Sequence, residues 1–230
     1  MCALPSSNLS PSPFSLYPCE LMIPFDPAKY AGYIFDCDGT LADTMPLHYQ
    51  AWDETLTKKL GGKHAFTEQL FYRFGGMPAR EIVTRLNTDF GYTLVPTDFA
   101  HEKEMRFVEL LPGIGPIQEV IDVLNRLPAD AKIAVASGGL TDIVRDTLKF
   151  LGLAVGPNEK IKFLVGSDQV SKGKPDPALF FRAAELLQVE PAKCIVFEDA
   201  EPGFLAAKAA GMDYIDVRPY RANISTAAKY

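Results

Sequence analysis

The sequence predicts an α/β protein, built as a doubly wound parallel sheet with a small all-helical domain inserted after the first strand. Three observations support this prediction. Short apolar runs that are typical of buried strands recur along the chain. From residue 112 onward these runs alternate with helical patterns, which produces a parallel sheet with helices on both faces. Residues 45–110, which follow the first run, contain helical patterns only.

The length and composition are those of a globular protein with one or two domains. A chain of 230 residues can bury a sizeable core, and 47% hydrophobic with 23% charged residues is ordinary for this class. The formal net charge of −6 argues against general binding to nucleic acid or to anionic membranes, because both favour a basic surface. An anionic small substrate stays compatible with this balance, because local charge and a bound cation decide its binding.

Residues 1–28 differ from the rest of the chain and are expected to form an N-terminal extension. They contain six prolines and five serines but no lysine or arginine, and they lack the charged and apolar regions of a secretory signal. No run in the chain is long enough to span a membrane. The four cysteines form no CxxC pair and no zinc-like spacing with histidine, which favours a reduced, cytoplasmic location.

The first strand is predicted at residues 32–36, and four helices follow it. These helices are predicted at 45–60, 67–74, 79–90 and 97–110, with glycine or proline marking several of their ends. Pro78 suits a first helical position, and Thr97 or Asp98 is the expected N-cap of the fourth helix. The all-helical domain therefore covers residues 45–110.

The remaining elements alternate between helix and strand. Helices are predicted at 115–127, 140–151, 176–188 and 202–210, and strands at 132–136, near 163–166, at 194–197 and at 214–217. Residues 29–44 and 111–230 should together form the core domain. A two-part molecule of this kind is expected to have a cleft between its parts.

Polar residues follow three of the predicted strands and precede one helix. Because the carboxyl ends of parallel strands share one edge of a sheet, where open α/β sheets bind ligands, these residues should converge. They are Asp36 and Asp38 after the first strand, Ser137-Gly138-Gly139 after the second, Lys174 before the helix at 176, and Glu198-Asp199 after the strand at 194–197.

Each of these groups also has an ordinary explanation when it is taken alone. An Asp-Gly pair after a strand is a common solvated turn, whereas Asp36 in the functional interpretation is a nucleophile near a cation. Ser137 before Gly138 and Gly139 is typical of a turn or a helix cap, but a hydroxyl and backbone amides also hold phosphate oxygens. Lys174 is a surface lysine by default, and a point charge that neutralises phosphate in the functional interpretation.

The four carboxylates favour the functional interpretation when they are taken together. At one sheet edge Asp36, Asp38, Glu198 and Asp199 would repel one another strongly unless a cation bound among them. A set of oxygen ligands suits Mg²⁺, which usually keeps room for water and for a substrate phosphate. The sequence therefore predicts a magnesium site at this edge.

These segments resemble the motifs of the haloacid dehalogenase superfamily, in its phosphatase branch. The first motif appears at residues 36–40 (Asp-Cys-Asp-Gly-Thr), the second as Ser137, the third as Lys174 and the fourth as Glu198-Asp199. The resemblance extends from about residue 32 to 220 and implies a Rossmann-like core with residues 45–110 as a cap domain. It is closest to the β-phosphoglucomutase-like group, including its fructose-1-phosphatase-like members. The residues that carry this closer resemblance are Asp43-Thr44, His48, Trp52, 196–200, Gly203 and 209–212.

The resemblance implies an aspartyl-phosphate mechanism with Mg²⁺ as cofactor. In this mechanism Asp36 attacks phosphorus, and Asp38 gives a proton to the leaving oxygen and later takes one from water. Ser137 and Lys174 would hold the phosphoryl oxygens. The implied metal ligands are Asp36, the main-chain carbonyl of Asp38, Glu198 and Asp199.

The substrate-binding residues are expected at the core edge and on the cap. Thr40 is expected to form a hydrogen bond near the developing charge. His48 and Trp52 are four residues apart and share a helix face, which the resemblance directs into the cleft; the alternatives are a surface imidazole and core packing. Gly76 and Arg80 belong to a segment that resembles the substrate loop of the cap, but Arg80 is out of register with the basic residue of that loop.

Three other functions compete with phosphatase activity. A phosphomutase uses the same core but must also bind a second phosphate, and no clear second cap base is found. A haloacid dehalogenase would leave Asp38 and Lys174 without a role. A non-catalytic sugar-phosphate binder would not need the catalytic set. We expect a small phosphorylated metabolite as the partner, no nucleic acid or membrane partner, and a monomer or homodimer.

Overall fold

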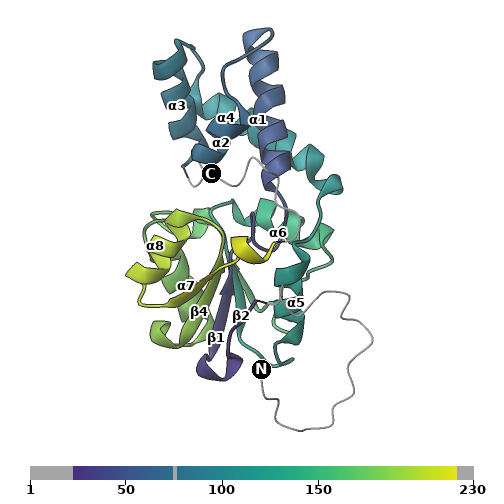
Figure 1. The fold of residues 1–230 in the computed structure, drawn as a ribbon, viewed down its shortest axis with the longest axis vertical. Helices are drawn as coiled ribbons and strands as arrows, with labels where there is room; N and C mark the ends of the chain where they lie inside the picture. Colours follow the sequence, from purple (N-terminus) through teal and green to yellow (C-terminus); the bar gives the residue numbers. More distant parts are fainter. Residues whose placement is uncertain (1–22, 75–76, 222–230) are drawn as a thin grey trace, which may run out of the picture.

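The computed structural model describes residues 23–74 and 77–221, and its core is a five-stranded parallel sheet in the order β3-β2-β1-β4-β5. This confirms the predicted fold class. Each predicted strand forms, with ends that differ by at most one residue (Figure 1). The strands are β1 (Gly32–Phe35), β2 (Ile133–Ala136), β3 (Phe163–Val165), β4 (Cys194–Glu198) and β5 (Asp213–Asp216).

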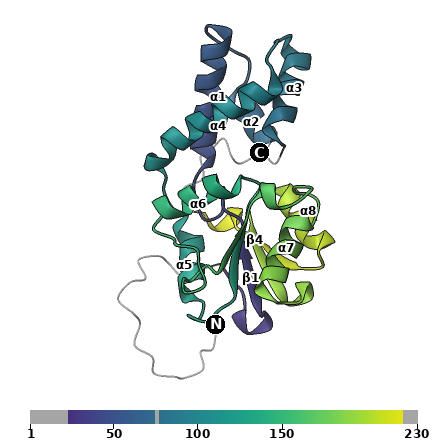
Figure 2. The same ribbon diagram turned by 180° about the vertical axis from the view of Figure 1, so that it is seen from behind.

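Helices cover both faces of the sheet, as Figures 1 and 2 show. The helices α5 (Gln118–Arg126) and α6 (Thr141–Phe150) pack on one face, and α7 (Ala178–Leu187) and α8 (Glu201–Ala209) pack on the other. Alternate residues of each strand point to opposite faces, so Phe35 belongs to the first core cluster and Ile34 to the second. The near-continuous apolar strands of the sequence are thus buried on both sides.

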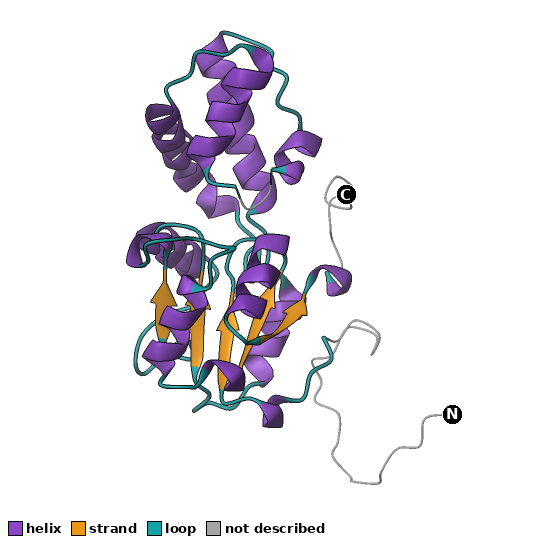
Figure 3. Ribbon diagram, turned by 90° about the vertical axis from the view of Figure 1, so that its left-hand side faces the viewer, coloured by secondary structure: helices purple, strands orange, loops and turns teal. Residues whose placement is uncertain are grey.

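The segment between β1 and β2 folds as a separate group of helices beyond the carboxyl ends of the strands (Figure 3). Its core contains buried side chains from all four helices and a connecting loop, including Trp52, Phe66 and Phe99. The helices are α1 (Met45–Leu60), α2 (Glu68–Arg73), α3 (Ala79–Phe90) and α4 (Pro96–Leu110).

The predicted N-cap of α4 is wrong. The helix begins at Pro96 and its N-cap is Val95, rather than Thr97 or Asp98. Proline suits a first helical position because its fixed φ angle matches the helix and its missing N–H needs no acceptor there.

The helix predicted at 115–127 begins only at Gln118, because the residues before it pair with the loop after β1. The amide of Asp43 donates to the carbonyl of Gly115 at 2.9 Å, and the amide of Ile117 donates to the carbonyl of Leu41 at 3.0 Å. The two linkers between the core and the helical group are therefore hydrogen-bonded to each other.

Short 3-10 helices complete the described part of the chain, and none of its helices is both long enough and apolar enough to cross a membrane. Of the predicted N-terminal extension, Ile23 is buried in the core, while residues 1–22 lie outside the described residues. The 3-10 helices are η2 (Pro27–Lys29), η3 (Leu111–Gly113), η4 (Ser167–Gln169), η5 (Pro191–Lys193) and η6 (Arg218–Tyr220).

Candidate active site

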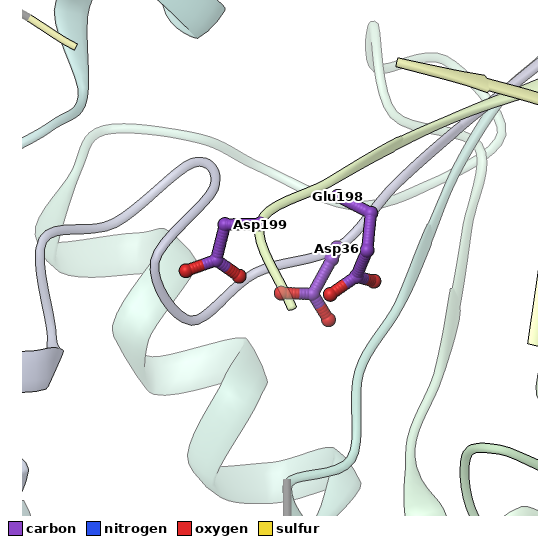
Figure 4. A group of neighbouring side chains, drawn as sticks. All are labelled: Asp36, Glu198 and Asp199. Carbon is purple, nitrogen blue, oxygen red and sulfur yellow. The ribbon is translucent and has the colours of Figure 1, made fainter. Parts of the chain in front are cut away.

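Three of the predicted carboxylates meet at the carboxyl ends of two neighbouring strands. Phe35 of β1 pairs with Phe197 of β4, so the acids that follow, Asp36 and Glu198, lie side by side. With Asp199 they form a cluster in which one oxygen of each carboxylate lies within 4.8 Å of the others (Figure 4). Register between parallel strands therefore brings together acids that are more than 160 residues apart in the sequence.

Two glycines leave the space that these carboxylates occupy. Gly39 has a φ angle of +80°, and a Cβ atom at this position would overlap the carboxylate of Asp199. A Cβ atom on Gly203, in the first turn of α8, would overlap the carboxylate of Glu198. The tight turn after β1 and the start of α8 thus shape the acidic cluster.

Lys174 is the cation nearest to two of the acids. Its Nζ lies 2.5 Å from Oδ1 of Asp36 and 2.7 Å from Oε2 of Glu198, and its side chain is 11% exposed. Burial alone would lower the pKa of Lys174, but the two carboxylates outweigh it and raise the pKa above its ordinary value. Lys174 is therefore a buried, charged lysine rather than the surface lysine of the ordinary explanation.

The cluster holds more negative charge than its surroundings neutralise. Burial and the charge of Glu198 raise the pKa of Asp36 to about 8, although Lys174 acts in the opposite direction. Burial and the charge of Asp36 raise the pKa of Asp199 to about 7. A bound cation would relieve this repulsion, and a buried set of carboxylate oxygens fits Mg²⁺. The residues present therefore fit the predicted cofactor.

Asp38 has a different environment from Asp36. The hydroxyl of Ser137 donates to Oδ2 of Asp38 at 3.2 Å and accepts from the amide of Gly139 at 3.0 Å. Nε2 of His48 lies 3.6 Å from Oδ1 of Asp38. Burial alone would raise the pKa of Asp38, but its contacts with His48 and Ser137 outweigh burial and lower the pKa. Two neighbouring acids thus have pKa values that are shifted in opposite directions, which suits different roles.

Lys103 of α4 is a residue of the site that sequence reasoning missed. Its buried Nζ donates to Nδ1 of His48 at 2.8 Å, because an ammonium group has no acceptor. The N–H of a neutral His48 must then be on Nε2, which faces Asp38. Burial and the charge of Lys103 lower the pKa of His48, so this histidine is neutral at neutral pH. Lys103 lies within a charged run of α4, and nothing in that run distinguished it from a solvated lysine.

Arg221 was also missed. Its guanidinium donates to Oδ1 of Asp43 at 3.1 Å and lies 3.6 Å from Oδ2 of Asp199, and its side chain is 9% exposed. The only signal in the sequence was a basic residue a few positions after the last strand, which is common in surface segments.

The other predicted site residues lie in different places. Thr40 is fully buried in the loop between β1 and α1, and its hydroxyl has no hydrogen-bond partner among the described residues. Gly138 is exposed at the sheet edge. Trp52 is 2% exposed and packs in the core of the helical group, which is the core-packing alternative to its predicted substrate contact. Arg80 is exposed on α3 and is not brought to the acids, and Gly76 lies outside the described residues.

Comparisons with known proteins show which family, sequences and folds this chain is similar to. Residues 33–217 match the model of a family described as haloacid dehalogenase-like hydrolases. The chain is 35% identical over 193 residues to the fructose-1-phosphate phosphatase YqaB of Escherichia coli, covering 83% of this chain and 97% of the relative. It is 32% identical over 205 residues to the β-phosphoglucomutase of Bacillus subtilis, covering 80% of this chain and 81% of the relative. Its fold is similar to that of CbbY from Rhodobacter sphaeroides, with a TM-score of 0.69, 26% identity, and coverage of 81% of this chain and 85% of that chain.

Proposed function

Because this chain belongs to the haloacid dehalogenase-like hydrolase family, in its β-phosphoglucomutase-like group of phosphatases, we propose that it is a Mg²⁺-dependent phosphatase of a small sugar phosphate. One observation carries the proposal: Asp36 lies against Lys174 and the acidic cluster, while Asp38 is held separately by Ser137 and His48. Helices α1–α4, in residues 45–110, act in this proposal as a cap domain over the strand ends.

In the first step, a carboxylate oxygen of Asp36 attacks the phosphorus atom and the bond from phosphorus to the sugar oxygen breaks. Asp38 gives its proton to that oxygen, so the sugar leaves as an alcohol and Asp36 carries the phosphoryl group. The ammonium of Lys174 and the hydroxyl of Ser137 donate to the phosphoryl oxygens during this transfer. The position of Lys174, 2.5 Å from Oδ1 of Asp36, supports this role.

In the second step, water attacks the phosphorus atom of the aspartyl phosphate. Asp38, now a carboxylate, takes a proton from this water, and the bond between phosphorus and Asp36 breaks to release inorganic phosphate. The contact of Asp38 with neutral His48 supports the role of Asp38 as the base in this second step, because the imidazole N–H stabilises the carboxylate form. The proton taken from water then stays on Asp38 for the leaving oxygen of the next substrate.

The Mg²⁺ ion would be held by Asp36, Glu198, Asp199 and the main-chain carbonyl of Asp38. When bound, it neutralises the phosphate charge and that of the nearby carboxylates, which otherwise repel an anionic substrate.

The relatives support a sugar phosphate as the substrate. One of them is named a fructose-1-phosphate phosphatase, and the solved CbbY structure is a complex with phosphate. A phosphomutase is the second candidate, because the B. subtilis β-phosphoglucomutase is similar over 80% of the chain. Sugar isomerisation that requires a bisphosphate activator and releases no net phosphate would favour the mutase. The cytoplasmic location, the partner classes and the oligomeric state stay predictions.

A phosphate-release screen tests the proposed function. Purified protein with Mg²⁺ should release phosphate from one or more sugar phosphates in a panel that also contains phosphoglycolate and nucleotides. Asp36→Asn should abolish turnover, and Asp130→Asn, which removes an exposed carboxylate far from the cluster, should leave it unchanged. Turnover that persists in Asp36→Asn or in the presence of excess EDTA would contradict the mechanism.

A further inference from the structure

Arg221 supplies a buried positive charge from the C-terminal end of the described chain to the acidic cluster. Its Nη2 donates to Oδ1 of Asp43 at 3.1 Å, and its Nη1 lies 3.6 Å from Oδ2 of Asp199. It follows residues 33–217, which are the part of the chain that matches the family model.

The backbone before Arg221 is fixed to the sheet. β5 pairs with β4 up to the last residue of each strand, and the amide of Val217 then donates to the carbonyl of Glu198 at 3.0 Å. Val217 is fully buried and Tyr220 packs against the core. The chain therefore leaves the sheet beside the acidic cluster, which directs Arg221 toward Asp199.

Asp43 anchors the other side of the guanidinium. It lies in the linker between β1 and α1, where its amide donates to the carbonyl of Gly115 in the second linker at 2.9 Å. The planar guanidinium of arginine has donors on two terminal nitrogens and can hold two carboxylates at once. Arg221 thus connects the junction of the two linkers to Asp199.

The carboxylate of Asp199 depends on Arg221 for its ion pair, whereas the carboxylates of Asp36 and Glu198 pair with Lys174. Lys174 lies within 2.7 Å of Asp36 and Glu198, whereas Arg221 is the cation at ion-pair distance from Asp199 in the described part of the chain. Without Arg221, repulsion from Asp36 would push the carboxylate of Asp199 away from the cluster.

A positive charge beside a metal ligand also competes with the metal ion. Here this competition is small, because Asp43 lies closer to the guanidinium than Asp199 does and already neutralises much of its charge. The effect of Arg221 on the orientation of Asp199 should therefore exceed its effect on the charge of the site.

We propose that Arg221 is a positioning residue that holds the carboxylate of Asp199 toward Asp36 and Glu198, so that Mg²⁺ affinity depends on a residue outside the family match. The proposal rests on the proposed Mg²⁺-dependent function. Mutation of a residue that contacts a metal ligand commonly lowers metal affinity by roughly ten- to a hundredfold, and we expect an effect of this size here.

Titration calorimetry of metal-free protein with Mg²⁺ tests this proposal without measuring turnover. Arg221→Gln should weaken Mg²⁺ binding by about tenfold or more. Arg221→Lys, which keeps the charge but not the planar fork, should weaken it to a smaller extent and provides a second test if the glutamine variant does not fold. Arg182→Gln is the matched control, because it also removes a guanidinium but one that pairs with Glu185 on α7, and it should bind Mg²⁺ as the wild type does.

The outcomes separate this proposal from the proposed function. Wild-type protein that neither binds Mg²⁺ nor releases phosphate would overturn the proposed function. Wild-type protein that binds Mg²⁺, together with folded Arg221 variants that bind it equally well or more tightly, would overturn the role of Arg221 alone. A purely structural role would lower the melting temperature of the variants and leave their Mg²⁺ affinity unchanged, which also counts against the proposal.

Discussion

Replacing Asp199 by asparagine should stabilise the metal-free protein at pH 8 while it weakens Mg²⁺ binding. The wild-type carboxylate is 13% exposed and lies beside Asp36 and Glu198, so its ionised form is costly in the folded state. Asparagine has nearly the same shape but no charge, and it removes this cost. The prediction tests whether the acidic cluster is built for a cation at the expense of stability.

The size of the effect follows from the pKa of Asp199. Burial and the charge of Asp36 raise this pKa from its ordinary value of 3.8 to about 7. The folded protein therefore keeps a proton that the unfolded chain releases, so stability falls as pH rises between these two values and the full cost is present above pH 7. This difference in pKa corresponds to about 4 kcal/mol in the free energy of unfolding.

Guanidinium denaturation in EDTA, followed by circular dichroism from pH 4 to pH 8, measures this difference. At pH 8 the midpoint of Asp199→Asn should exceed that of the wild type by up to roughly 1 M, and the difference should shrink toward pH 4. The exposed Asp130→Asn variant should match the wild type throughout. Equal stability of wild type and Asp199→Asn at pH 8, or a difference that does not depend on pH, would refute the reasoning.

Three other substitutions test the site and the cap. Gly203→Ala should weaken Mg²⁺ binding by about tenfold or more, because the added Cβ displaces the carboxylate of Glu198, and calorimetry would measure this change. Lys103→Met should lower kcat by at least about tenfold with little change in melting temperature, because His48 loses the donor that sets its tautomer; an unchanged kcat would contradict this role. Trp52→Ala should reduce the free energy of unfolding by about 3–5 kcal/mol, because Trp52 is buried in the core of the helical group. A variant with normal stability but a raised KM would contradict this core role and favour the predicted substrate contact.

The fold and the acidic edge of the sheet were predictable because their signals are local. A short apolar run identifies a buried strand, and alternation with helices requires the strands to be parallel. Parallel strands place their carboxyl ends on one edge, so Asp36 and Glu198 had to be neighbours once β1 and β4 were adjacent. The motif residues therefore predicted correctly that the acids lie at the edge formed by the carboxyl ends of the strands.

The cap and the outer contacts of the site were less predictable, because they depend on packing between distant segments. Residue spacing alone did not reveal whether the side chain of Trp52 faces the cleft or the core of the helical group. In the structure Trp52 packs against the aromatic side chains Phe66 and Phe99 in that core. The helix α4 had the charge pattern of a solvated helix, yet its packing against α1 buries Lys103.

The sequence by itself determined the order of the elements, the edge at which the acids gather, and the kind of cation that suits them. Only the tertiary structure decided which further basic groups support the site: Lys103 behind His48, and Arg221 at Asp199. The reason is physical. A strand and its register are specified by neighbouring residues and backbone hydrogen bonds, whereas a long basic side chain finds its partner through space and carries no sign of that partner in its own segment of sequence.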